Sequence, residues 1–222
     1  MNMKNIKKHV KNEVQKIATD GKTVEQNVVA FIKTDFHDTL KDCNQAKTSI
    51  KQATHDTLDG ISSGLKVAGY TGHKALEQSA HAIAEVGHDF SNESVVLARD
   101  HADQAKAKLD DALDKAHGEI DNVEAKTRDA MEQAHTTLHE KTEQEKARLK
   151  EIGEAIADYP VKAKTLELSD EAKAALHQAA EKSKTHLTAL GNEAQAHSKV
   201  LLHHGKAKAS EWLGKLADKV KP

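Results

Sequence analysis

Histidine is the residue type in this sequence with the greatest capacity for chemistry. It accounts for 15 of the 222 residues, and imidazole serves both as a metal ligand and as an acid–base group near neutral pH. His135 and His139 are four positions apart, so on a helix both rings can reach one metal ion; His197, His203 and His204 form a second cluster. The first pair lacks the glutamate that follows the first histidine in metalloprotease helices. We therefore expect histidines on a polar helical face, with no metal site.

Other residues that could take part in binding or catalysis are isolated from one another. His37, His55 and His73 are each 18 residues apart, which is five helical turns or about 27 Å, too far to share a ligand. Cys43 is the single cysteine; it cannot form an internal disulfide, and we expect it to be a small buried residue. The glycines of residues 60–72 lack the lysine and hydroxyl ending of a phosphate-binding loop. We therefore expect no catalytic residue, no cofactor and no enzymatic activity.

The composition excludes several classes of protein. The chain is 37% hydrophobic, 3% aromatic and 31% charged, with a mean hydropathy of −0.69, so it has little material for a large enzyme core. The net charge of −2 does not favour nucleic acid as a partner. The basic N-terminus lacks the apolar segment of a signal peptide. We expect a cytoplasmic protein that is at most peripheral on a membrane or granule surface.

The strongest signal is a period of eleven residues. Two columns of positions spaced by eleven, one from Ile6 to Leu149 and one from Val10 to Gly153, contain no charged residue, whereas the column that starts at Lys11 is polar throughout. Eleven residues make three turns at 3.67 residues per turn, so the apolar stripe stays nearly straight along a helix. The pattern predicts an all-α protein of long amphipathic helices, folded back as an antiparallel hairpin or bundle and partly disordered in solution.

This stripe is the candidate binding surface for lipid or a protein partner. It continues into the C-terminal helix, where the only tryptophan lies on it. Its larger members are Ile6, Val10, Ile17, Val28, Ile32, Ile50, Ile61, Leu65, Leu76, Ile83, Leu109, Ile120, Leu138, Leu149, Leu187, Leu190, Leu201, Trp212 and Leu216.

The positions of the glycine and proline residues divide the chain into three predicted regions. Residues 1–158 form a repeat region with a glycine-rich hinge at 60–72, residues 159–168 are a proline-containing connector, and residues 169–222 are a basic amphipathic helix. The residue before a proline is disfavoured in the helical conformation, so the sequence places a helix end at Tyr159-Pro160.

Small residues recur every four positions in the predicted hinge. Gly60, Gly64, Ala68 and Gly72 would line one side of a helix, where they would allow close approach of a second helix. A flexible hinge explains the same glycines equally well. A second break is expected after Gly87, with Ser91 as the N-cap of a helix that continues to residue 158.

Charge differs between segments. Residues 1–52 carry a net charge of +4, residues 91–158 carry −7, and residues 161–222 carry +4. Basic ends beside an acidic middle favour folding of the ends onto the centre, and they also suit an anionic lipid surface.

The segment His101–Asp111 resembles the eleven-residue repeat of group 3 late-embryogenesis-abundant proteins. The matching positions are Ala102, Ala105, Lys106, Lys108 and Asp111, and Asp114–Glu119 repeats the end of the motif. The same period is found in exchangeable apolipoproteins, synucleins and lipid-droplet coat proteins. This resemblance implies a hydrophilic helix-forming protein that protects other proteins and bilayers during stress such as desiccation, or that lies on lipid.

Two functions follow as expectations. The first is a non-enzymatic stress-protective or surface-coating protein whose stripe binds membranes, lipid, hydrophobic granules or exposed patches of client proteins. The alternative is a structural or interaction protein that forms a stable bundle or coiled coil with itself, as a homo-oligomer, or with a partner.

Overall fold

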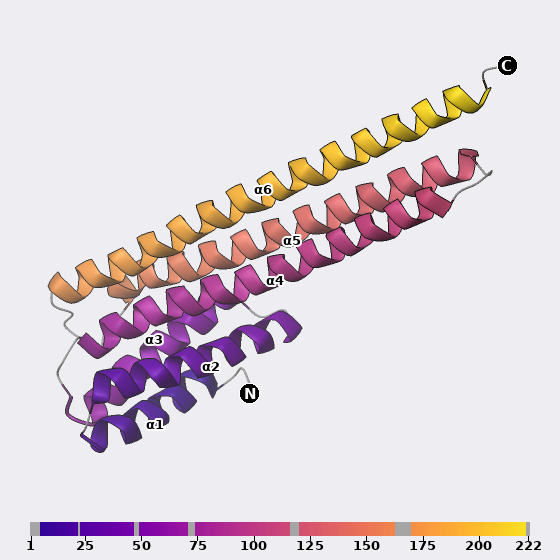
Figure 1. The fold of residues 1–222 in the computed structure, drawn as a ribbon. Coiled ribbons are helices and arrows are strands. Elements are labelled where there is room, and N and C mark those ends of the chain that lie inside the picture. Colours follow the sequence, from indigo (N-terminus) through magenta and orange to yellow (C-terminus); the bar gives the residue numbers. More distant parts are fainter. Residues whose placement is uncertain are drawn as a thin grey trace. The chain divides into compact units, whose positions relative to one another are not determined.

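The computed structural model of the chain consists of helices joined by short connections (Figure 1). It describes residues 5–21, 23–46, 49–70, 74–115, 120–162 and 170–220, some of them, including 112–115, 120–128 and 215–220, as backbone only. Within these residues there is no strand, which confirms the predicted all-α class. The helices are α1 (Ile6–Thr19), α2 (Val24–Ala46), α3 (Ile50–Val67), α4 (Lys74–Lys115), α5 (Ile120–Lys162) and α6 (Asp170–Val220).

The chain forms two compact units. Unit 1 comprises Met1–Ser91 and Lys146–Thr188, and unit 2 comprises Asn92–Glu145 and Ala189–Pro222. Each of the helices α4, α5 and α6 therefore contributes one segment to each unit.

Unit 1 is organised around α3. Its N-cap Ser49 accepts a hydrogen bond from the backbone N–H of Gln52 at 3.2 Å, which satisfies one of the free donors of the first turn. On one side α3 contacts α1, and on another the backbone N–H of Lys51 donates to Glu151 of α5 at 3.1 Å. The Lys51 ammonium also pairs with Asp158 of α5 at 2.9 Å. This ion pair joins a basic N-terminal residue to the acidic central segment, as the charge distribution predicts.

In unit 2, α4 and α6 run in the same direction as neighbours. Contacts between them recur at a constant separation of 94 residues, as for Arg99 with Glu193 at 3.3 Å and Asp110 with His204 at 3.2 Å. The α5 segment contacts α6 where Met131 lies beside Gly205.

The break predicted between Gly87 and Ser91 is wrong, because α4 runs through both residues from Lys74 to Lys115. Gly87 serves packing instead: a Cβ at this position would lie 2.5 Å from Cδ1 of Ile152 on α5. Ser91 is buried within the helix and is not an N-cap.

A boundary that the sequence analysis did not anticipate separates α4, which ends at Lys115, from α5, which begins at Ile120. The uninterrupted helix predicted up to residue 158 is therefore two helices. The one signal in this part of the sequence is Gly118, since glycine is a poor helix former.

The predicted helix end at Tyr159-Pro160 is also displaced, because Pro160 lies inside α5, which ends at Lys162. A proline this close to a helix end removes a single backbone hydrogen bond, and the packing of α5 outweighs that loss. The predicted connector therefore overlaps α5, and the remainder of it, 163–168, lies outside the described residues. The C-terminal helix starts at Asp170, one residue after the predicted start.

Residues 60–67 of the predicted hinge are helical, since α3 continues to Val67. The turn follows in residues 68–70, where Gly69 has a φ of +72°, a conformation that glycine adopts without strain. Gly72 lies outside the described residues.

Candidate functional site

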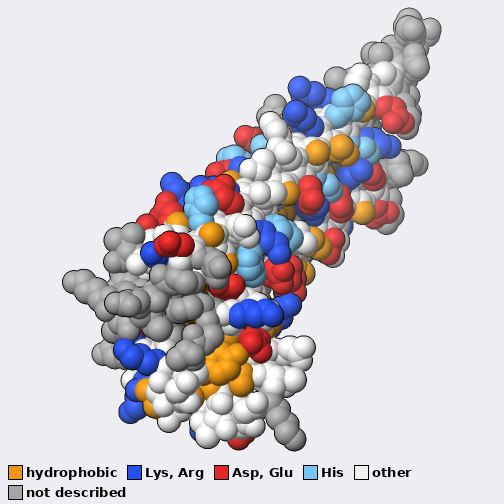
Figure 2. Space-filling model, turned by 90° about the vertical axis from the view of Figure 1, so that its left-hand side faces the viewer, with side chains coloured by type: hydrophobic (Ala, Val, Ile, Leu, Met, Phe, Trp, Pro, Cys, Tyr) orange, Lys and Arg blue, Asp and Glu red, His pale blue; other side chains and the backbone are white. Residues whose placement is uncertain are grey.

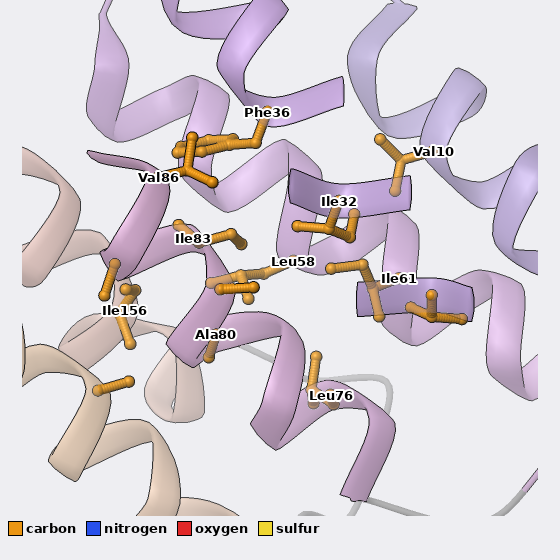
Figure 3. Close-up of a cluster of buried hydrophobic side chains, with 14 of the residues drawn as sticks. Val10, Ile32, Phe36, Leu58, Ile61, Leu76, Ala80, Ile83, Val86 and Ile156 are labelled. Atoms are coloured by element: carbon orange, nitrogen blue, oxygen red, sulfur yellow. The ribbon is translucent and has the colours of Figure 1, made fainter. Parts of the chain in front are cut away.

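Most of the apolar stripe lies inside the protein. The buried members on helices α1 to α4 share one hydrophobic core with Phe36, Leu58 and Ile156. Figure 3 shows Leu58 near the centre of this core, with side chains of the stripe around it. The buried stripe residues of unit 1 are Ile6, Val10, Val28, Ile32, Ile61, Leu65, Leu76, Ile83 and Leu149.

The remaining stripe residues differ in exposure. Ile17, Ile50 and Leu187 are half-buried. In unit 2, Leu138, Leu190 and Leu201 are buried. The side chains of Leu109, Ile120, Trp212 and Leu216 lie outside the described residues, although their backbone is helical.

Gly60 and Gly64 form the close helix contact that the small-residue pattern predicts. A Cβ on Gly60 would lie 2.7 Å from Cβ of Val10 and 2.9 Å from the carbonyl oxygen of Lys7. One turn later, a Cβ on Gly64 would lie 2.7 Å from the carbonyl oxygen of Lys11. The two glycines thus allow the backbones of α1 and α3 to touch. Ala68 follows α3 as its C-cap and is only half-buried.

Several buried polar side chains of unit 1 have a hydrogen-bond or ring partner within the unit. The hydroxyls of Thr57 and Ser79 donate to backbone carbonyls one turn earlier, at 2.9 and 2.6 Å. The Tyr159 hydroxyl donates to the carbonyl of Leu58 at 3.2 Å, and burial raises the pKa of this phenol. Arg148 is 4% exposed, with its guanidinium 4.7 Å from the centre of the Phe90 ring. These contacts stabilise the fold of unit 1.

Unit 2 buries fewer large apolar side chains than unit 1 among the residues that the structure describes. Among the described residues it buries alanines and two polar side chains, Thr142 and Glu145, beside a few larger apolar groups. Large apolar residues are exposed on two of its helices: Val96 and Leu97 on α4, and Val200 and Leu202 on α6. The buried residues of unit 2 are Val95, Ala98, Ala102, Met131, Leu138, Thr142, Glu145, Leu190, Ala194 and Leu201.

The histidine clusters singled out by spacing lie on α5 and α6. On the face shown in Figure 2, histidines are interspersed with side chains of both charges. The rings of His135 and His139 have centroids 6.5 Å apart. Among the residues that the structure describes, there is no group of three or more potential ligands placed to hold a metal.

Two histidines of α6 instead face aspartates of α4 within unit 2. His197 lies 3.5 Å from Asp103 and His204 lies 3.2 Å from Asp110. The aspartates are seven residues apart, as are the histidines, so each helix presents its pair on one side. This matched spacing is the signal by which the sequence could have indicated the contact.

A third histidine contact, in unit 1, was not anticipated. His88 of α4 and His186 of α6 stack with ring centroids 3.9 Å apart, and no local sequence pattern links residues so far apart. Burial and the neighbouring positive charges of His88 and Lys182 lower the pKa of His186, while Asp89 and Glu85 oppose the shift. Two charged imidazoles in this stack would repel each other.

The His88–His186 stack makes stability depend on pH. Because the pKa of His186 is lowered on folding, the folded state binds fewer protons than the unfolded chain. The contribution of neutral His186 to the free energy of unfolding is complete above about pH 6.5 and is lost as pH falls below that value. We expect His186→Gln to flatten the decline in the free energy of unfolding between pH 7 and 5, measured by urea denaturation. Exposed His177→Gln on the same helix is the control, and an unchanged slope in His186→Gln would contradict the prediction.

Cys43 is unsuited to redox chemistry in the folded protein. Its side chain is buried, and burial raises the pKa of the thiol to about 11. Since the thiolate is the reactive form, Cys43 acts as a small core residue, as its place in the apolar column predicts.

In the described part of the chain, no helix combines the length and the apolar character that crossing a bilayer requires. No protein-family profile, curated protein or solved structure matches this chain. The likeness of residues 101–119 to late-embryogenesis-abundant repeats therefore stays a prediction from the sequence.

Proposed function

We propose that this chain is a non-enzymatic, peripheral surface-binding protein that keeps its apolar stripe inside a helical bundle in water and presents part of it to lipid. Hydrophobic granules and exposed patches of client proteins are related surfaces that the same stripe would suit. The proposal places binding in unit 2 and assigns unit 1 a permanent structural role.

The observation that carries this proposal is the difference between the two interiors. Unit 1 buries isoleucine, leucine, valine and phenylalanine, including Ile32, Phe36 and Ile61 at 0% exposure. Among the described residues of unit 2, the buried large apolar side chains are limited to Val95, Met131, Leu138, Leu190 and Leu201. Each Å² of buried apolar area contributes about 25 cal/mol to stability. Exposing the smaller apolar interior of unit 2 therefore costs less free energy than exposing that of unit 1. The helices of unit 2 can thus exchange their own contacts for those of a lipid surface.

A disulfide across unit 2 tests whether opening is needed. A Cβ on Gly205 would lie 3.8 Å from Cγ of Met131, the position that a cysteine sulfur would take, so Met131→Cys with Gly205→Cys can be bridged after a small shift. We expect the reduced double variant to keep salt-resistant binding to anionic vesicles. Its apolar residues should become shielded from solvent when it is bound to the vesicle surface. The oxidised variant should bind the vesicles only through electrostatic attraction, so high salt should abolish its binding.

The wild-type chain under the same oxidant and reductant is the matched control. Its one thiol, Cys43, is buried with its pKa raised to about 11, so the redox conditions alone should change nothing. Salt-resistant binding of the oxidised variant at the level of the reduced one would contradict a role for opening.

The second candidate is a constitutive structural bundle that binds a protein partner or a second copy. Burial of the predicted stripe in the core of unit 1 favours it. A protein that is fully helical, melts cooperatively and ignores anionic vesicles would support this candidate over the first.

A further inference from the structure

Residues 194–210 of α6, in unit 2, form one of the two longest stretches of the chain without an acidic residue. Residues 194–210 contain no aspartate or glutamate, although acids make up 35 of the 222 residues. The same stretch contains three lysines and three histidines. Because charges of both signs usually alternate along an exposed helix, a stretch of this length without acids is suited to an anionic partner.

The acids at the two ends of this stretch have positive partners. Glu193 pairs with Arg99 of α4 at 3.3 Å, and Glu211 lies 3.6 Å from Lys208 on its own helix. On the inner side of α6, His197 and His204 face aspartates of α4. The negative charges near the stretch are thus engaged at its ends and on its inner side.

The outward side carries unengaged positive charge. Lys199, His203 and Lys206 are exposed, and their spacing of four and three residues aligns them along one side of the helix. Within the described part of the chain, neither lysine has an ion-pair partner in the structure. Val200 is 58% exposed and Leu202 is 45% exposed, and by helical geometry they flank the lysines on opposite sides.

We propose that this face, Lys199–Lys206 of α6, docks the folded protein onto the anionic phospholipid headgroups of a bilayer. The lysines meet the phosphates and carboxylates of the headgroups, and the two exposed aliphatic side chains enter the interface between headgroups and acyl chains. Those aliphatic groups favour a bilayer over a nucleic acid, whose phosphate backbone offers them no apolar phase. The inference rests on the proposed function and identifies the side of unit 2 that meets the lipid first, before any opening.

The test is binding of the full-length chain to mixed phosphatidylserine–phosphatidylcholine vesicles at low salt, with pure phosphatidylcholine vesicles for comparison. Lys199→Glu with Lys206→Glu should weaken binding to the mixed vesicles about tenfold or more, since each basic residue near such a surface contributes several-fold. Both positions are exposed, so the helicity of the variant should equal that of the wild type.

Lys173→Glu with Lys184→Glu is the matched control. It makes the same change in net charge on the same helix, but these lysines belong to unit 1, where each pairs with an acid three residues earlier, Asp170 and Glu181. We expect less than a twofold effect on binding. A second variant, Val200→Ser with Leu202→Ser, should weaken binding to mixed vesicles several-fold without changing its salt dependence.

The outcomes separate this inference from the proposed function. If the wild type binds mixed vesicles and Lys199→Glu with Lys206→Glu binds equally well, the docking face is wrong while surface binding stands. If the wild type binds neither vesicle, the proposed function fails as well. If the wild type binds polyuridylic acid more tightly than mixed vesicles and the lysine variant loses that binding, the face recognises nucleic acid, and the lipid assignment is overturned.

Discussion

Replacing Gly60 and Gly64 together by alanine is expected to separate α1 from α3 and to destabilise unit 1 strongly. Each new Cβ would lie 2.7 Å from an atom of α1, and each would also lie within 2.9 Å of a backbone carbonyl oxygen of that helix. A backbone oxygen cannot move aside as a flexible side chain can, so α1 must shift as a whole. Overpacking costs about 1–3 kcal/mol per site, whereas the better helix propensity of alanine returns at most about 1 kcal/mol per site.

With the full propensity gain, the net loss for the two sites is up to about 4 kcal/mol. Because both Cβ atoms meet a backbone oxygen, we expect the upper half of this range, about 2–4 kcal/mol of unfolding free energy, measured by urea denaturation with far-UV circular dichroism. Gly214→Ala is the matched control, because a Cβ at Gly214 meets no atom of the described residues within 4 Å and alanine is the better helix former there. The control should be neutral or slightly stabilising. Equal stability of the double variant and the wild type would mean that α1 and α3 do not touch at these glycines.

Ile61→Asp is expected to unfold unit 1, whereas Val67→Asp near the end of the same helix should have little effect. Ile61 is 0% exposed and Val67 is 52% exposed. Removing a buried isoleucine side chain alone costs about 2–5 kcal/mol, and placing a carboxyl group in the same apolar site adds a further desolvation cost of several kcal/mol. The total approaches or exceeds the stability of an ordinary small domain.

The pH dependence of Ile61→Asp gives an independent check. A carboxyl group in an apolar core has a raised pKa, so the folded variant would bind more protons than its unfolded chain and its stability deficit should shrink as pH falls toward 4. Val67→Asp should show no such recovery. If Ile61→Asp unfolded at the same urea concentration as the wild type, the stripe would not be the core of unit 1, and a lipid-facing position for Ile61 would become the better interpretation.

Some features of this protein follow from its sequence alone. An excess of alanine and charged residues, two prolines, and apolar positions with a helical period leave helices as the only regular structure. The same spacing identified Val10, Ile32, Ile61 and Ile83 as members of one apolar face, and all four are buried. Gly60 and Gly64 were recognisable as a contact surface because residues four apart share one side of a helix.

Helix boundaries were less predictable because local preferences compete with packing. Gly87 and Ser91 are unfavourable inside an isolated helix, yet α4 continues through them, and the side chain of Ile152 packs against Gly87. Pro160 is tolerated near the end of α5. At Gly87 the contact with Ile152 offsets a local cost of about 1 kcal/mol.

What covers each apolar face was decided only by the tertiary structure. A periodic sequence specifies that a helix has an apolar side, and the free energy gained by burying that side is nearly the same against lipid, a partner or the helix's own chain. The contact of His88 with His186, and of Lys51 with Asp158, joins residues about a hundred positions apart. Such pairs depend on which helices become neighbours, and that choice results from the close fit of side chains such as Val10 against Gly60.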